Sequence, residues 1–163
     1  MNAALAAWRK LEAKPLGKAL FSRFVCLKAP YFGTISPRFE ELRPGYARVS
    51  MRKRRAVTNH IGTVHAIAMC NLAELAAGTM TEVSIPESMR WLPKGMTVEY
   101  LKKSTGGIHA VATLPDVADT AEGLLQAADA AMYRVKVSGK NGIHIAGSEN
   151  ETARLPAEEQ ELS

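Results

Sequence analysis

The sequence predicts an α+β fold in which an antiparallel sheet wraps around one buried central helix. Apolar and polar residues alternate along 47–52, 96–100 and 108–114, the period-two pattern of strands that bury one face. Residues 65–80 are instead apolar on nearly every side, which is typical of a helix buried all round. Its alanines would allow strands to approach closely, so a single sheet folded around this helix satisfies both patterns.

Length and composition predict one main folded unit, because 163 residues with 47% hydrophobic side chains can build a substantial core. The net charge of +5 is unevenly distributed: residues 149–163 hold five Glu against one Arg, a net of −4, which leaves +9 on residues 1–148. Such a basic body favours an anionic partner: nucleic acid, a membrane surface, a phosphorylated cofactor or an acidic carrier protein. The basic run lacks the interleaved aromatic residues that stack on bases, so we expect no nucleic-acid binding.

The two cysteines indicate a reducing compartment, since Cys26 and Cys70 match neither a disulfide framework nor a CxxC motif. Arg9 and Lys10 interrupt the N-terminal apolar residues before a signal-peptide core could form, and no later apolar run is long enough to span a bilayer. We therefore expect a cytoplasmic protein without a membrane span. No pattern suggests a metal or a cofactor.

An amphipathic helix is predicted for residues 16–28. Leu16, Leu20, Phe21, Phe24 and Val25 recur there at spacings of three and four, with basic residues on other faces. Such a helix could lie on a membrane surface or form a lid over an acyl chain, but packing against the domain's own core is the more common role.

A β-hairpin is predicted over residues 96–114, because Ser104 to Gly107 supply turn residues between the two alternating runs. The earlier strand, around residues 47–51, ends in Arg52, Lys53, Arg54 and Arg55. This basic end is interpreted either as a contact for phosphates or for an acidic protein, or as a solvated strand end.

The stretch from Asn59 to His65 is a polar, glycine-containing turn that leads directly into the central helix. The first amide groups of that helix would face the turn and form an anion or oxyanion site. Glu74 is the only charged residue between His65 and Thr81, and a buried carboxylate must be paired, protonated or functional. Asn71 stands three residues earlier and could hydrogen-bond Glu74, which would give the pair a purely structural role.

The run Asn59-His60-Ile61-Gly62-Thr63-Val64-His65, followed nine positions later by Glu74, resembles the signature of the phenylacetyl-CoA thioesterase-like branch of the hotdog superfamily. The resemblance covers roughly residues 31–115. It implies a hotdog fold and a homodimer or dimer of dimers, with Asn59 of one chain facing Glu74 of its partner. It also implies an acyl-CoA or acyl-carrier thioester as the substrate.

The same resemblance implies roles for individual residues. Glu74 would act as general base or nucleophile, and Asn59 would orient the water or the carbonyl, while His65 enters the helix. The Ala66 and Ile67 amides would form the oxyanion hole. The substrate would be bound by the following residues: Gly62, Thr63, Ala66, Ile67, Arg54 and Arg55.

One departure from the family pattern keeps a second function open. The family commonly has two glycines after the histidine, whereas this chain has Ala66 and Ile67, and Ile67 crowds the proposed oxyanion hole. We therefore expect an acyl-thioester hydrolase or, as the alternative, a non-catalytic acyl-thioester-binding protein with the same pocket.

The C-terminal part departs from the hotdog pattern. Residues 120–133 suggest a helix where two long strands are expected, and residues 120–146 resemble the closing helix and strand of a diguanylate cyclase catalytic domain, without its signature motif. Only residues 143–146 suggest a replacement strand, so the sheet would be atypical or incomplete. We divide the chain into a helical segment (1–29), a core (30–116), an atypical helix and strand (117–147) and a disordered acidic tail (148–163).

Overall fold

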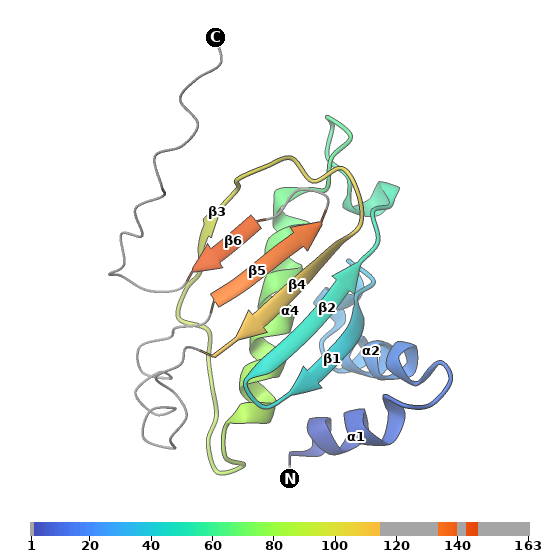
Figure 1. The fold of residues 1–163 in the computed structure, drawn as a ribbon, viewed down its shortest axis with the longest axis vertical. Helices are drawn as coiled ribbons and strands as arrows, with labels where there is room; N and C mark the ends of the chain where they lie inside the picture. The colour runs from blue at the N-terminus through green and yellow to red at the C-terminus, as the bar shows by residue number, and fades with distance from the viewer. Residues whose placement is uncertain (1, 115–133, 140–142, 147–163) are drawn as a thin grey trace.

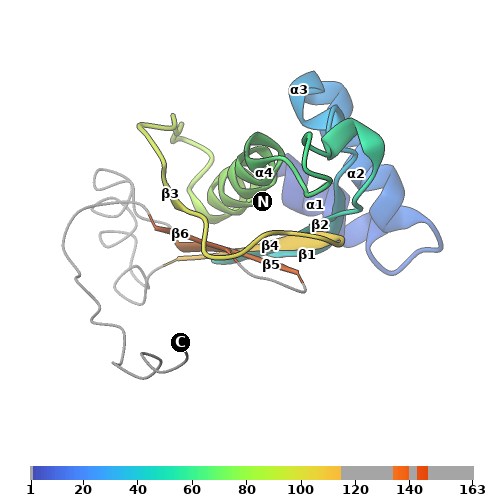
Figure 2. The same ribbon diagram turned by 90° about the horizontal axis from the view of Figure 1, so that it is seen from above.

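The computed structural model describes residues 2–114, 134–139 and 143–146. Six strands form one antiparallel sheet in the order β1-β2-β4-β5-β6-β3, and the long helix α4 lies across one face of it (Figures 1 and 2). This arrangement confirms the predicted α+β class. The elements are α1 (Ala3–Leu11), α2 (Gly17–Lys28), α3 (Pro30–Gly33), β1 (Arg38–Arg43), β2 (Tyr46–Met51), the 3₁₀ helix η1 (Arg55–Val57), α4 (Ala66–Ser84), β3 (Thr97–Glu99), β4 (Ile108–Thr113), β5 (Arg134–Gly139) and β6 (Ile143–Ala146).

Helix α4 is the buried central helix that the sequence predicts. Most of its residues are buried, among them Leu72, Ala76 and Met80 with no exposed surface. The helix begins after His65 and ends before Pro86, which cannot continue a helix. It packs against β1, β2, β4 and β5.

Small side chains on the sheet allow this close packing. Ala47 on β2 and Ala110 and Ala112 on β4 are completely buried, and the register pairs Ala47 with Ala112 across the two strands. The β1–β2 turn contains Pro44 and Gly45, and Gly45 has a φ of +75° that a residue with a side chain rarely adopts.

An aromatic cluster joins the N-terminal helices to the sheet edge. Trp8 of α1, Phe21 of α2 and Phe39 of β1 are buried, with ring centroids 5.1 Å apart for Trp8–Phe21 and for Phe21–Phe39. The Ser22 hydroxyl donates to the Lys18 carbonyl and accepts the Phe39 amide at 2.8 Å, which ties α2 to β1. Helix α2 therefore belongs to the folded core along this face.

The predicted hairpin over residues 96–114 is wrong, although both strands exist. Strand β3 pairs with β6, with Val98 opposite Ile145, and β4 pairs with β2 and β5 instead. The turn residues around Gly106 therefore connect strands that lie far apart in the sheet (Figure 1).

The sheet continues beyond Leu114. Strand β6 confirms the strand suggested for residues 143–146, and β5 adds a strand that was not expected. A local signal for β5 exists, because Val135 and Val137 alternate with Arg134 and Lys136. The helix expected at residues 120–133 and the disordered tail from 148 lie outside the described residues, and the division of the chain at residue 116 stays a prediction.

Candidate functional site

The loop that leads into α4 is organised by the side chain of Asn59. Its Oδ1 accepts the amides of Ile61 at 3.2 Å and Thr63 at 3.0 Å, and its Nδ2 donates to Thr63 Oγ1 at 2.7 Å. Gly62 completes the turn with a φ of +76°. The carboxamide of Asn59 is thus engaged by its own loop, and its first role in a single chain is to shape that loop.

His65 caps the N-terminus of α4. Its Nδ1 accepts the Ile67 amide at 3.1 Å, and its own amide donates to the Val57 carbonyl at 2.8 Å. An imidazole that accepts at Nδ1 carries no proton there, so the cap requires neutral His65. The Ile67 amide is occupied by this cap, whereas the structure gives the Ala66 amide no hydrogen-bond partner within the described residues. Of the two proposed oxyanion donors, Ala66 is therefore the available one.

Glu74 is exposed, so the expectation that it is buried is wrong for the single chain. It lies with Ile67 and Cys70 along one stripe of α4, and this stripe interrupts the burial of the helix. We call these three residues the α4 stripe. Asn71 faces the interior with 4% of its surface exposed, and no hydrogen bond joins it to Glu74 in the described structure. The structural Asn71–Glu74 pair is therefore not formed.

The oxyanion donor and the carboxylate lie far apart in one chain. Ala66 and Glu74 are eight residues apart on the same helix, which corresponds to about 12 Å along its axis. A thioester carbonyl held at the helix N-terminus is therefore out of reach of Glu74 of the same chain.

Tyr100 lies beside the α4 stripe and was not foreseen as a site residue. Its hydroxyl is 3.1 Å from Cys70 Sγ. This hydrogen bond and, to a smaller extent, burial raise the pKa of Tyr100 to about 12. Tyr100 therefore stays protonated throughout the physiological range and can donate a hydrogen bond. No sequence pattern placed it here, because Cys70 and Tyr100 are 30 residues apart.

A pocket of about 180 Å³ opens next to the helix N-terminus. Asn71 contributes a buried carboxamide: Nδ2 donates to Thr34 Oγ1 over a long 3.4 Å, and Oδ1 has no partner among the residues that the structure describes. A buried acceptor without a donor is costly, so this atom is suited to a group that a ligand or a water brings. The pocket is lined by Tyr31, Thr34, Ile35, Ala56, Val57, Thr58, His65, Ile67, Ala68 and Asn71.

The two arginines proposed to bind substrate differ in their surroundings. Arg54 Nη2 donates to the Thr34 carbonyl at 2.6 Å and to Ser36 Oγ at 3.1 Å, so its guanidinium is largely committed to the adjacent loop. Arg55 is exposed on η1 and remains accessible to an anion. Of Gly62 and Thr63, Gly62 is exposed at the tip of the loop, whereas Thr63 is buried and bonded to Asn59.

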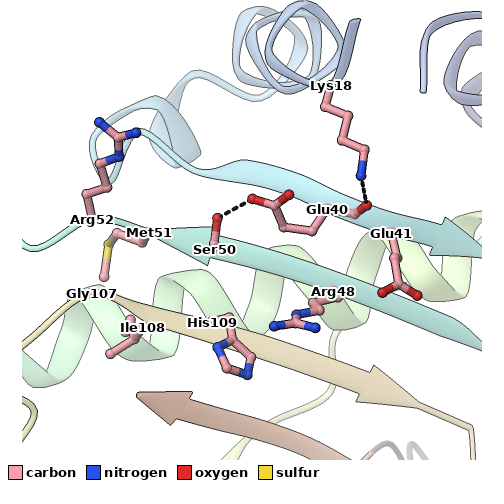
Figure 3. Close-up of a pocket in the computed structure, with 10 residues that line it drawn as sticks. All are labelled: Lys18, Glu40, Glu41, Arg48, Ser50, Met51, Arg52, Gly107, Ile108 and His109. Carbon is pink, nitrogen blue, oxygen red and sulfur yellow. Dashed lines mark hydrogen bonds between the residues drawn. The ribbon is translucent and has the colours of Figure 1, made fainter. Parts of the chain in front are cut away.

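A second, wider hollow of about 490 Å³ lies on the sheet face opposite α4 (Figure 3). Arg48, Ser50 and His109 point into it from β2 and β4, beside Glu40 and Glu41 of β1. Burial and the neighbouring Arg48 lower the pKa of His109. None of the residues proposed for the site from sequence lines this hollow, which separates it from the helix N-terminus.

The described residues contain neither a metal-binding cluster nor a membrane-spanning helix. Within the described ranges no group of His, Cys, Asp and Glu side chains is arranged to hold a metal ion. In the same ranges no helix is long and apolar enough to cross a membrane.

This chain is similar to one family model and to several solved structures. Residues 17–151 match the family model described as "Domain of unknown function (DUF4442)". The crystal structure of a structural genomics target, APC5556, is 42% identical with a TM-score of 0.66, over 89% of this chain and 98% of that one. No curated protein matches the sequence.

Two more distant solved structures share the fold. PA5026 from Pseudomonas aeruginosa, described as a protein of unknown function and "Probable Thioesterase", is 23% identical with a TM-score of 0.61, over 83% of this chain and 97% of that one. The PaaI protein of the Escherichia coli phenylacetic acid degradation operon is 15% identical with a TM-score of 0.54, over 81% and 92%. The family match runs through residues 120–146, so the resemblance of that segment to a cyclase domain is not supported.

Proposed function

Because this chain belongs to the DUF4442 family and has the hotdog fold, we propose that it is an acyl-thioester hydrolase whose active site forms between two copies of the chain. The observation that carries the proposal is the exposed α4 stripe with Glu74. A helix that is otherwise buried leaves one carboxylate on an accessible strip, about 12 Å from the N-terminus that could stabilise an oxyanion. A second copy can bring its own helix N-terminus to this carboxylate.

The surface around the α4 stripe supports such a pairing. Ile67, Tyr100 and Leu101 are large hydrophobic side chains with about half of their surface exposed in the single chain. Strand β3 lies at one edge of the sheet, directly before Tyr100 and Leu101 in the sequence, and an exposed edge strand readily pairs with another chain. We propose a homodimer, or a dimer of dimers, that covers this surface and places Asn59 of one chain opposite Glu74 of the other.

In this site Glu74 is the general base or nucleophile towards the thioester, and the Ala66 amide stabilises the developing negative charge. Asn59 and His65 act by fixing the loop and the helix start, with Gly62 and Thr63 shaping the wall. The Ile67 amide can join the oxyanion hole only if the His65 cap opens. Arg55 is placed to meet the phosphates of coenzyme A, while Arg54 supports the loop.

One structural neighbour, PA5026, is described as a "Probable Thioesterase", which agrees with this chemistry, and another, PaaI, is described as coming from the phenylacetic acid degradation operon. The proposed compartment is the cytoplasm, where thiols such as Cys26 and Cys70 remain reduced; both are free in the structure.

The occupied Ile67 amide favours a second candidate. With a single free amide at the helix start, the site would stabilise an oxyanion weakly, so the protein would bind acyl thioesters without hydrolysing them.

A panel of acyl-CoA and acyl-pantetheine substrates with free-thiol detection tests both functions. In the hydrolase, Glu74→Gln keeps the shape of the side chain and removes the base, so turnover should fall roughly 10²-fold while folding and affinity persist. Glu41→Gln is the matched control, because it removes an exposed carboxylate from the opposite sheet face. Turnover that survives Glu74→Gln would show that Glu74 is not the catalytic base, and tight binding by wild type without turnover would favour the binding protein.

A further inference from the structure

Helix α2 has two apolar faces, and only one of them packs on the core. Phe21 is completely buried against Trp8 and Phe39, and Gly17 and Ser22 are buried with it. On the other side a row of large apolar side chains faces outward. We call this row the α2 stripe; it consists of Leu16, which precedes the helix, Leu20, Phe24 and Leu27 of α2, and Tyr31 of the following helix α3.

The exposure along the α2 stripe is continuous. Leu16 is 84% exposed, Leu20 57%, Phe24 47%, Leu27 73% and Tyr31 64%. Leu20, Phe24 and Leu27 follow one another at spacings of four and three residues, so they lie on one face of α2 and extend over about 10 Å. Leu16 and Tyr31 lie just beyond the two ends of this helix. A single exposed leucine is ordinary on a protein surface, but a contiguous strip of this kind marks an interaction surface.

Charge indicates what the strip binds. Residues 13–39 contain no Asp or Glu and five basic residues: Lys14, Lys18, Arg23, Lys28 and Arg38. Arg23 and Lys28 are exposed on α2, and the Lys28 ammonium lies 5.9 Å from the centre of the Phe24 ring, at the edge of the strip. An outward apolar stripe on a helix whose own charged residues are all cations is typical of a helix that lies in the interface of an anionic membrane.

The part of the stripe that lies on α2 is remote from β3, the edge strand of the proposed pairing surface. Helix α2 lies at the β1 end of the sheet and β3 at the opposite end in both views (Figures 1 and 2). A twofold contact between two α2 stripes would bring Arg23 and Lys28 of both copies together with no acidic residue on either helix to compensate. Self-association through this face is therefore electrostatically unfavourable.

We propose that the α2 stripe docks the protein on the surface of an anionic lipid bilayer. The Leu and Phe side chains insert at the level of the acyl boundary, and Arg23 and Lys28 meet lipid phosphates. Tyr31, at the end of the stripe, also lines the pocket beside His65 and Asn71, so the docked face adjoins the mouth of that pocket. This docking does not depend on hydrolysis, and its test measures binding alone.

The test is flotation of the full chain with vesicles of neutral phosphatidylcholine and with vesicles containing phosphatidylglycerol as well. We expect binding to the anionic vesicles that decreases with salt. Leu20→Ser with Phe24→Ser should lower partitioning by at least about 10-fold, because two inserted side chains are lost. Arg23→Gln with Lys28→Gln should reduce it by a similar factor on anionic vesicles only. The matched control, Leu92→Ser with Met96→Ser, removes exposed apolar side chains elsewhere and should bind as wild type does.

The proposal would be overturned if wild type did not bind the vesicles, or if the control variant lost as much partitioning as the stripe variants. It would also be overturned if wild type did not bind vesicles while the stripe variants changed the mass measured by light scattering. The last result would assign the stripe to a protein partner. Phe24→Trp keeps a large apolar side chain and supplies a second readout, because its emission should shift to the blue on anionic vesicles. This readout remains available if the serine variants fold poorly, and an unchanged spectrum would count against docking.

Discussion

Asn59 organises the entrance to α4 through three hydrogen bonds of its side chain, two from backbone amides and one to Thr63. Asn59→Ala should remove all three and leave two amides without their acceptor. The expected loss is about 1–3 kcal/mol in the free energy of unfolding, measured by urea denaturation. Asn59→Asp keeps the acceptor and should recover most of that stability. Equal losses in both variants would mean that Oδ1 does not hold the loop.

His109 makes the stability of the fold sensitive to acid. Burial and the adjacent Arg48 lower its pKa, so the unfolded chain binds a proton at this position more readily than the folded protein does. Its contribution to stability is therefore complete above the unfolded value of about 6.5 and is lost as the pH falls below it. Urea midpoints measured from about pH 7.5 to 5 should decline, and His109→Gln should flatten the decline. The exposed His60→Gln is the control and should leave the decline unchanged.

At the scale of residues, the sequence proposed a site whose function stays a prediction. Asn59, His65 and Glu74 were proposed from the resemblance to a family signature, and the structure places Asn59 and His65 at the start of α4. The burial of Glu74 could not be predicted correctly, because exposure depends on which strands cover each side of α4. Tyr100 was missed because its contact with Cys70 joins segments that no local pattern relates.

At the scale of elements, Gly17 determines how α1 and α2 meet. A Cβ atom at this position would overlap the backbone carbonyl oxygen of Leu11, which cannot move without displacing the end of α1. Gly17→Ala should therefore cost about 3 kcal/mol, seen as a lower melting temperature. Gly106→Ala, where no atom lies within 4 Å, should change stability by less than about 0.5 kcal/mol. Equal melting temperatures would show that the two helices can separate without cost.

The elements themselves were predictable where the signal is local. Helices α2 and α4 and strands β2 and β4 follow the periods of their own side chains, so they were found close to their observed bounds. The pairing of β3 was predicted incorrectly because strand order is a non-local property: a turn-like sequence at 104–107 suits a hairpin, yet β3 pairs with a strand more than 40 residues later. Strand β5 shows the opposite case, a local alternation that was present and overlooked.

At the scale of the whole molecule, a second copy should cover the α4 stripe. Light scattering should give a dimer or a dimer of dimers for wild type. Ile67→Asp places a charge in the centre of the proposed contact, so it should shift the protein to monomers and abolish any thioester turnover. Leu20→Asp, on α2 at the opposite end of the sheet from β3, should leave the mass unchanged. A monomeric wild type with full turnover would contradict the shared site.

The pairing of β3 with β6 determines the order in which the molecule can be completed. On the ribosome, β1, β2 and β4 can assemble with α4 as soon as residue 113 has emerged, since their contacts lie within that stretch. Strand β3 is synthesised before β4, yet its partner arrives only with residues 143–146. The segment that carries Tyr100 therefore stays without its neighbouring strand until residues 143–146 have emerged. A chain stopped after β4 would hold α4 and Glu74 but could not close the edge of the sheet beside them, so the emergence of β6 is the step that completes this edge.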